Sequence, residues 1–321
     1  MKPTMEHFFS HIKGQESVTR MLQETLKQDK LSHAYLFWGP PGVGKKTTVQ
    51  ALARAVLGIT ASTEETWPEH PDFLVIAPQE EEKSIGKNLI AKTLIPWLGI
   101  RPYQAKQKIA VIGEAQRMTP EASNALLKIL EEPPLYGVII LLADRLELLE
   151  TIISRCQCIR FSALREETLV SILCSRGLSQ EEAQKISSIS GGNAHLALRF
   201  HPAEMEGQWQ TAEQLLRQLA GGEKSGVFSA AAAIEKNPVL LTAIMLYLRD
   251  LFIYQETGQT ELLLLPEKVK TLPSISASRD KIPLWWETQA LYQQQTSNVN
   301  KQMLYVNICF KLHHMLTTRA V

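Results

Sequence analysis

The chain has 321 residues, of which 45% are hydrophobic and 21% are charged, a composition typical of globular proteins. Its 34 basic and 33 acidic residues leave a net charge of +1, which excludes a general electrostatic attraction to nucleic acid. No apolar run reaches the roughly eighteen residues of a membrane span, and no signal-peptide pattern opens the chain. We therefore expect a cytoplasmic protein of two or three domains without membrane contact.

The first half of the chain alternates short apolar runs with amphipathic segments. The amphipathic segments predict helices over residues 15–30, 45–58, 87–100, 120–132 and 146–155. The apolar runs predict strands over residues 34–38, 73–78, 108–113, 137–143 and 156–161. Strands without polar alternation are typical of a parallel sheet with both faces covered, so the pattern predicts an α/β domain over residues 1–163.

Everything after residue 163 has helical patterning. Residues 164–204 contain two predicted helices and a third that follows the glycine pair of "GGNAHLALRF". Residues 205–321 form a second helical region, in which the proline-containing segment 263–283 is expected to be a connection.

The cysteines are few and lack the paired spacing of a zinc site or a disulfide framework. Cys156 and Cys158 stand two apart in a strand-like run, so we expect two small buried thiols on one face. The sequence predicts no metal site.

The stretch "GPPGVGKKT", residues 39–47, nearly matches the phosphate-binding loop GxxxxGK[ST], in which backbone N–H groups surround the phosphates. It follows a predicted strand and precedes a predicted helix, as this loop requires. Lys46 stands where a Ser or Thr hydroxyl would bind Mg²⁺, and Thr47 is one residue too late to replace it. The candidate nucleotide-binding residues, whose retention of ATP or ADP the sequence leaves open, are Gly39, Gly42, Gly44, Lys45 and Thr47.

A second ATPase element should be an apolar strand that ends in Asp-Glu, whose Asp holds Mg²⁺ and whose Glu polarises the attacking water. "KIAVIGEAQRM" supplies the strand and Glu114, but Gly113 stands in place of the Asp. Lys46 and Gly113 are two independent losses around one ion, so we expect magnesium-dependent hydrolysis to be absent.

Four stretches carry a family resemblance: "SHAYLFWGPPGVGKK", "HPDF", "KIAVIGEAQRMTPEASNALLKILEEPP" and "IISRCQCIRF". Over roughly residues 10–200 the chain resembles the clamp-loader branch of the AAA+ ATPases, and within it the delta-prime family of bacterial DNA polymerase III. The resemblance implies an AAA+ sheet domain over 1–163, a small helical lid over 164–204 and an all-α collar over 205–321. It also implies as partners the gamma/tau and delta subunits, a sliding clamp and primed DNA.

The resemblance further assigns Arg155, in "SRC", the role of an arginine finger that reaches the ATP of a neighbouring subunit. Such a guanidinium stabilises charge on the transferring phosphoryl group. Where active members carry a polar sensor and a lid arginine, this chain has Ala143-Asp144-Arg145 and His195, the latter expected to be a surface histidine. The segment that holds a four-cysteine zinc module in many relatives is "GITASTEETWPE", without cysteine, so no zinc is expected.

Three functions stay open at this point. The first is a delta-prime-like subunit with a degenerate ATP site and an intact trans-acting Arg155. The second is an active gamma/tau-like ATPase, which would need Lys46 and Gly113 to be compensated elsewhere. The third is a non-replicative AAA+ adaptor. A weaker idea is direct DNA contact through a basic cluster of Arg101, Lys106, Lys108 and Arg117.

Overall fold

The computed structural model describes residues 5–59, 66–78, 84–198, 202–221, 223–269, 281–293 and 300–317. The chain forms two compact units, Met1–Leu198 and Arg199–Val321.

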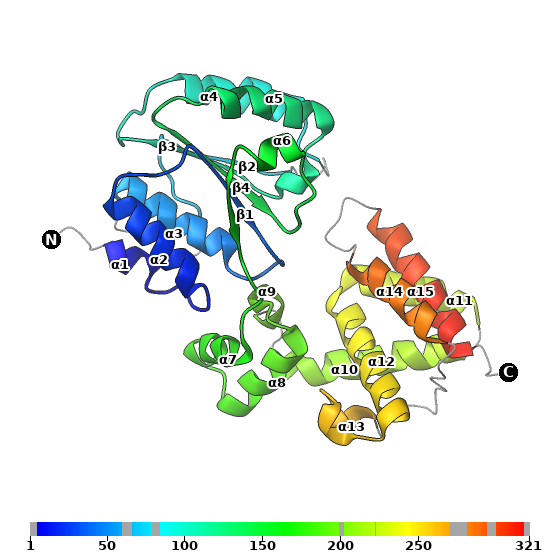
Figure 1. Cartoon of the computed structure of the whole chain (residues 1–321). Coiled ribbons are helices and arrows are strands. Elements are labelled where there is room, and N and C mark those ends of the chain that lie inside the picture. The colour runs from blue at the N-terminus through cyan, green and yellow to red at the C-terminus, as the bar shows by residue number, and fades with distance from the viewer. Residues whose placement is uncertain are drawn as a thin grey trace. The chain divides into compact units, whose positions relative to one another are not determined.

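The first unit is built on a parallel sheet of five strands, in the order β2-β3-β4-β1-β5 (Figure 1). This sheet confirms the predicted α/β fold. Because all the strands run in one direction, the loops that follow β1, β3 and β4 gather at one edge, the carboxyl edge. The strands are β1 (Ala34–Trp38), β2 (Phe73–Ile76), β3 (Lys108–Ile112), β4 (Gly137–Ala143) and β5 (Gln157–Arg160).

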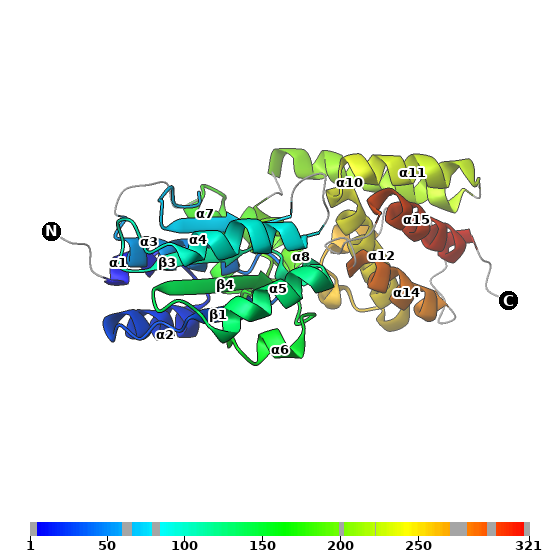
Figure 2. The ribbon, with the colours of Figure 1, turned by 90° about the horizontal axis from the view of Figure 1, so that it is seen from above.

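Helices cover both faces of the sheet, and successive side chains of each strand alternate between two cores. Phe37 packs on the side of α1 (Met5–Phe9), α2 (Glu16–Lys27) and α3 (Lys45–Leu57). Leu36 packs on the other side, where Figure 2 shows α4 and α5 lying over the strands. That face is covered by η1 (Leu89–Leu94), α4 (Ile95–Gly99), α5 (Pro120–Glu131) and α6 (Glu150–Ile153), and the short η2 spans Ala115–Arg117.

Two predicted helices differ from the structure. The helix expected over 87–100 starts as a turn of π-helix, in which Ile95 N donates to Ile90 O, and continues as α4. Pro96 has no N–H for a regular α-helical bond, and a wider turn is one way to accommodate that loss. The helix expected over 146–155 shrinks to α6, because the leucines that gave it helical spacing lie in an exposed loop, among them Leu146 and Leu149.

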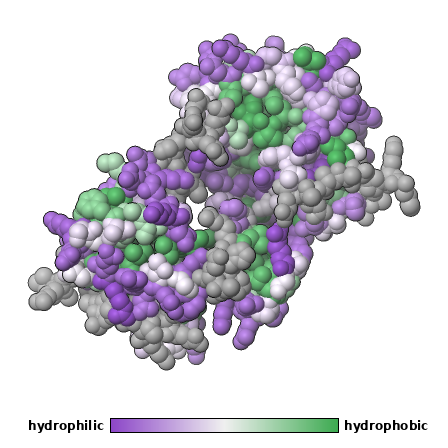
Figure 3. Space-filling model, turned by 180° about the vertical axis from the view of Figure 1, so that it is seen from behind, coloured by the Kyte–Doolittle hydropathy of each residue, from purple (hydrophilic) through white to green (hydrophobic). Residues whose placement is uncertain are grey.

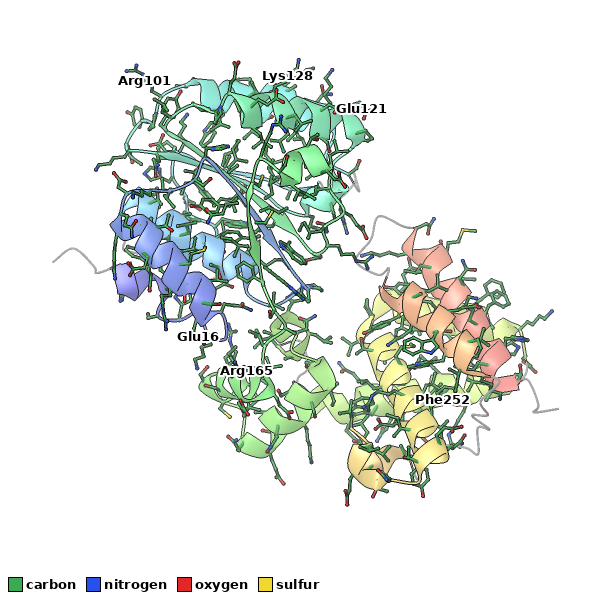
Figure 4. All side chains as sticks on the ribbon, viewed as in Figure 1. Glu16, Arg101, Glu121, Lys128, Arg165 and Phe252 are labelled. Atoms are coloured by element: carbon green, nitrogen blue, oxygen red, sulfur yellow. The ribbon has the colours of Figure 1, made fainter. Side chains whose placement is uncertain are left out.

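Three short helices complete the first unit: α7 (Glu166–Ser175), α8 (Gln180–Ser190) and α9 (Ala194–Ala197). Ala194 N of α9 donates to Gly42 O at 3.0 Å and so connects this region to the phosphate-binding loop. Gln15 Nε2, before α2, donates to both Val43 O of that loop and Ser162 O of the segment before α7. Figure 4 labels Glu16 on α2 and Arg165 at the start of α7. Backbone hydrogen bonds lower the pKa of Glu16, and the positive charge of Arg165 adds a smaller lowering. A separate lid domain over residues 164–204 remains a prediction.

The described residues of the second unit form helices and their connections, as the sequence predicts for this region. Trp209 of α10 packs edge-on against Tyr247 of α12, with ring centroids 5.3 Å apart. The predicted connection 263–283 contains a short helix, and its residues 270–280 lie outside the described residues. The elements are α10 (Pro202–Ala220), α11 (Ser225–Lys236), α12 (Val239–Thr257), η3 (Thr260–Leu262), α13 (Pro266–Val269), α14 (Ile282–Gln293) and α15 (Lys301–Thr317).

Within the described residues, no single helix is long and apolar enough to cross a membrane. Only α11 and α12 taken together pass that test of length and composition, and the chain bends by 118° between them. Hydrophilic side chains cover much of the face in Figure 3, with hydrophobic areas between them.

Candidate functional site

A cavity of about 850 Å³ opens at the carboxyl edge of the sheet, within the first unit. Its walls come from the segment before α2, from the phosphate-binding loop, from the loops after β3 and β4, and from α7 and α9. Four of the predicted nucleotide-binding residues, Gly42, Gly44, Lys45 and Thr47, line it, and so does Glu114 of the altered Asp-Glu element. Gly39 does not line it. His195 is exposed on α9, as the sequence suggested, and it also lines the cavity, together with Ala194 and Leu198.

The phosphate-binding loop has the backbone that its glycines predict. Gly44 is the N-cap of α3 at φ 98°, and no side chain caps the first-turn N–H groups. Gly42, at φ 73°, lies so close to the side chain of Asn193 that a Cβ would overlap its oxygen. The loop therefore directs uncapped donors toward the cavity, the arrangement that binds an anion.

Lys45 is 8% exposed, and its ammonium is fully engaged inside the chain. It donates to Gly39 O at 2.5 Å, to Pro40 O at 2.7 Å and to Asp144 Oδ1 at 2.9 Å. These three acceptors use all three donors of a lysine. The sequence gave Asp144 no role beyond the absence of a sensor, but its place directly after β4, beside β1, was a signal that it would face the loop.

Lys46 and Thr47 provide no metal ligand of the usual kind. The ammonium of Lys46 lies over the ring of Trp67, 5.2 Å from its centroid, in a cation–π contact. Thr47 lines the cavity, while the hydroxyl of the next residue, Thr48, donates to Gly44 O.

The element after β3 is likewise altered. Gly113 has room for a side chain, because a Cβ there would meet only Ala77 and Ile76 at 3.7 Å. Glu114 adopts φ 51°, uncommon for a residue with a side chain, and its carboxylate pairs with Arg117 at 2.9 Å. The carboxylate of Glu114 is thus held by Arg117 and not directed at a water beside the phosphate-binding loop.

A magnesium ion, which the P-loop fold implies, does not fit this set of residues. Mg²⁺ prefers oxygen ligands, and the two positions that would supply them hold an ammonium group and a hydrogen atom, at Lys46 and Gly113. Among the described residues there is also no group of three or more His, Cys, Asp or Glu side chains that could hold a metal ion.

Arg155 lies at the opposite edge of the sheet from this cavity. It follows α6 and precedes β5, and its guanidinium donates to Glu131 Oε1 at 2.9 Å and to Thr151 O at 3.0 Å. Its side chain is 35% exposed. The guanidinium is thus oriented by two acceptors and still accessible.

Asp72, in the "HPD" stretch, has a role that the sequence did not reveal. The carboxylate is fully buried and accepts N–H bonds from Tyr103, Gln104 and Ala105 at 2.7, 2.8 and 2.9 Å. Burial acts to raise the pKa of Asp72, but the three donors outweigh it, and the pKa is lowered. Asp72 therefore fixes the backbone of the loop before β3.

The four cations of the predicted basic cluster do not all lie together. Lys108 is buried at the start of β3, donates to Trp97 O at 2.7 Å and lies over the Trp97 ring. Arg117 follows the other end of β3 and pairs with Glu114. Strand β3 separates these two cations, so they share no surface, while Arg101 and Lys106 are exposed on the loop before β3.

The cysteine prediction is wrong, because neither thiol is fully buried. Cys158 is exposed on the edge strand β5, and Cys156 is half-buried. Burial, with a smaller effect from Cys158, raises the pKa of Cys156 to about 12.

Comparison with known proteins agrees with this architecture. A family model described as DNA polymerase III, delta subunit, matches residues 14–165. The delta' subunit of Bacillus subtilis DNA polymerase III is 30% identical over 191 residues, which are 56% of this chain and 57% of that protein. The tau subunit of the same organism is 28% identical over 323 residues, 89% of this chain and 56% of that protein.

The chain thus spans less than two thirds of the length of these curated relatives. A solved Thermotoga maritima protein related to the gamma subunit covers 91% of this chain and 98% of its own, at 18% identity and a TM-score of 0.42, too low to support an argument about function. The sequence relatives and the family model name the same group of proteins as the motifs. The chain is therefore similar to the delta-prime and gamma/tau subunits of the DNA polymerase III clamp loader.

Proposed function

We propose that this chain is a delta-prime-like clamp-loader subunit that does not hydrolyse ATP itself and supplies Arg155 to the ATP of a neighbouring subunit. The observation that carries the proposal is an asymmetry. Both magnesium positions of its own site are lost, at Lys46 and Gly113, whereas Arg155 is oriented and accessible.

The sheet geometry supports an action in trans. Tyr35 pairs with Gln157, so Arg155 lies level with His33, at the amino edge. The phosphate-binding loop begins at Gly39, six residues further along β1, which at roughly 3.3 Å per residue amounts to about 20 Å. An arginine side chain does not span that distance, so any phosphoryl group that Arg155 stabilises belongs to another chain.

The names of the relatives suggest which subunits this chain assembles with. The delta', tau and gamma/tau proteins are named as subunits of DNA polymerase III. We propose that this chain assembles with gamma/tau and delta subunits, through a collar formed by residues 205–321, and acts with them on a sliding clamp and primed DNA. DNA polymerase activity would belong to the holoenzyme.

The experiment is ATP turnover by a complex reconstituted from this chain and its gamma/tau and delta partners. Arg155→Ala should leave assembly intact, as read by size-exclusion chromatography, and abolish turnover at the one site it serves, because a finger contributes about 10³–10⁵ to the rate. Arg145→Ala is the control, because Arg145 is a partly exposed arginine that pairs with Glu147 at the other edge of the sheet. Unchanged turnover and clamp loading in the Arg155 variant would refute the assignment.

An active gamma/tau-like ATPase is the second candidate, favoured by the match to tau over 89% of this chain. It predicts magnesium-dependent ATP hydrolysis by the isolated chain that disappears on Lys45→Ala. Our proposal predicts no such hydrolysis.

A further inference from the structure

Two adjacent lysines begin α3, at the end of a helix where positive charge is unfavourable. The first turn contains no acidic residue, and the N-cap is a glycine without a side-chain cap. The positive end of the helix dipole, the uncapped N–H groups, Lys45 and Lys46 therefore converge on the cavity. Such an arrangement needs negative charge opposite to it.

The chain supplies one negative charge itself. Asp144, from the loop after β4, lies 2.9 Å from the ammonium of Lys45 and also lines the cavity. In a P-loop, the lysine normally reaches the β- and γ-phosphates. In this chain, Asp144 therefore takes the place of a terminal phosphate as the anionic partner of Lys45.

Lys46 differs from Lys45, because its ammonium contacts the face of the Trp67 ring and not a carboxylate. Its side chain is exposed, lines the cavity and occupies the sequence position of the magnesium ligand. An ammonium group there can provide positive charge to phosphate oxygens in place of an ion. The cavity walls also include aliphatic side chains from four segments, suited to a nucleobase: Ile12, Val43, Leu164 and Ile172.

We propose that this cavity binds a nucleoside diphosphate as a metal-free anion, and that Asp144 makes it select against the triphosphate. A third phosphate would have to displace Asp144 from Lys45 and then lie beside its carboxylate, so that two negative groups would compete for one ammonium. The β-phosphate of a diphosphate can lie on the loop N–H groups beside Lys46 while Lys45 stays paired with Asp144, so it forgoes the usual lysine contact without meeting the carboxylate. This selection does not depend on the role of Arg155, which is tested in the assembled complex.

The test is equilibrium binding of ADP and of ATP to the full chain, by calorimetry, in EDTA and again in magnesium. We expect ADP to bind at least tenfold more tightly than ATP, and magnesium not to tighten either. Trp67 fluorescence should change on ADP binding, because Lys46 leaves its ring. ATP binding as tight as that of ADP, tightening by magnesium of tenfold or more, or absence of ADP binding at millimolar concentration in EDTA would each overturn the proposal.

Variants locate the selectivity. Asp144→Asn should raise ATP affinity at least tenfold and bring the ADP/ATP ratio toward one, while Glu147→Gln, which removes a carboxylate from the same loop outside the cavity lining, should leave the ratio unchanged. Lys46→Ala should weaken ADP about tenfold, the scale of one charge-assisted hydrogen bond. An unaltered ratio in the Asp144 variant would show that the carboxylate is not the selector, and the comparison on the native chain does not require any variant to fold.

Discussion

Replacing Asp72 by Asn tests whether one buried carboxylate holds the loop before β3. The native oxygens accept three backbone N–H bonds, from Tyr103, Gln104 and Ala105. An asparagine keeps one oxygen and places an NH₂ group against at least one N–H donor. Losing one hydrogen bond to a charged group, and weakening the other two, should lower the free energy of unfolding by about 3 kcal/mol.

Urea unfolding of the first unit, followed by the fluorescence of its tryptophans, measures this cost. Amide hydrogen exchange across residues 100–107 should rise in parallel, because the three N–H groups lose their acceptor. Asp29→Asn is the matched control, since Asp29 is exposed and has the positive φ that asparagine tolerates. If Asp72→Asn changes the free energy of unfolding by less than about 0.5 kcal/mol, the range of an ordinary surface substitution, and leaves exchange unaltered, Asp72 does not hold this loop.

The same residue gives a pH dependence with a defined sign. The pKa of Asp72 is lowered in the folded chain, so its stabilisation is fully present above the unfolded value of about 3.9. It is lost as the pH falls through the folded value. The difference in stability between the native chain and Asp72→Asn should therefore narrow in acid.

Three further predictions concern other parts of the chain. Gly42→Ala should cost about 2–4 kcal/mol, because it combines a positive φ with overlap, whereas Gly58→Ala, with a similar φ and open space, should cost about 1 kcal/mol in thermal unfolding. Restoring magnesium ligands with Lys46→Thr and Gly113→Asp together should make nucleotide binding tighten with magnesium, and calorimetry without that change would contradict our account of the lost ion site. Tyr247→Phe should leave the chain as stable or up to about 1 kcal/mol more stable, since the buried hydroxyl has no hydrogen-bond partner among the described residues, and a clear loss of stability on unfolding would refute this.

The sequence predicted the sheet and the phosphate-binding loop because both depend on local patterns. Each of these patterns can be recognised within a stretch of about ten residues: the apolar runs of β1 and β4, and the glycines at 42 and 44. The contacts that decide the chemistry are not local. Asp144 meets Lys45 across 99 positions of sequence, and no spacing rule connects them.

Contacts between residues distant in sequence also explain why some predicted segments and sites were wrong. Exposed Leu146 and Leu149 have helical spacing without a core to bury them, so pattern alone extended α6 too far. Lys108 and Arg117 are close in sequence, yet a strand holds them at opposite ends. Asp72 stood in a quoted motif, but its partners lie more than thirty positions later.

The separation of Arg155 from the phosphate-binding loop gives the subunit a direction. If Arg155 acts on a neighbour, contacts between subunits are head-to-tail, with the amino edge of one sheet facing the carboxyl edge of the next. A member that donates an arginine but does not hydrolyse can serve one neighbour and need not be served by another. It can therefore stand at the end of a row of working sites, where an open gap in the ring would leave no catalytic site incomplete.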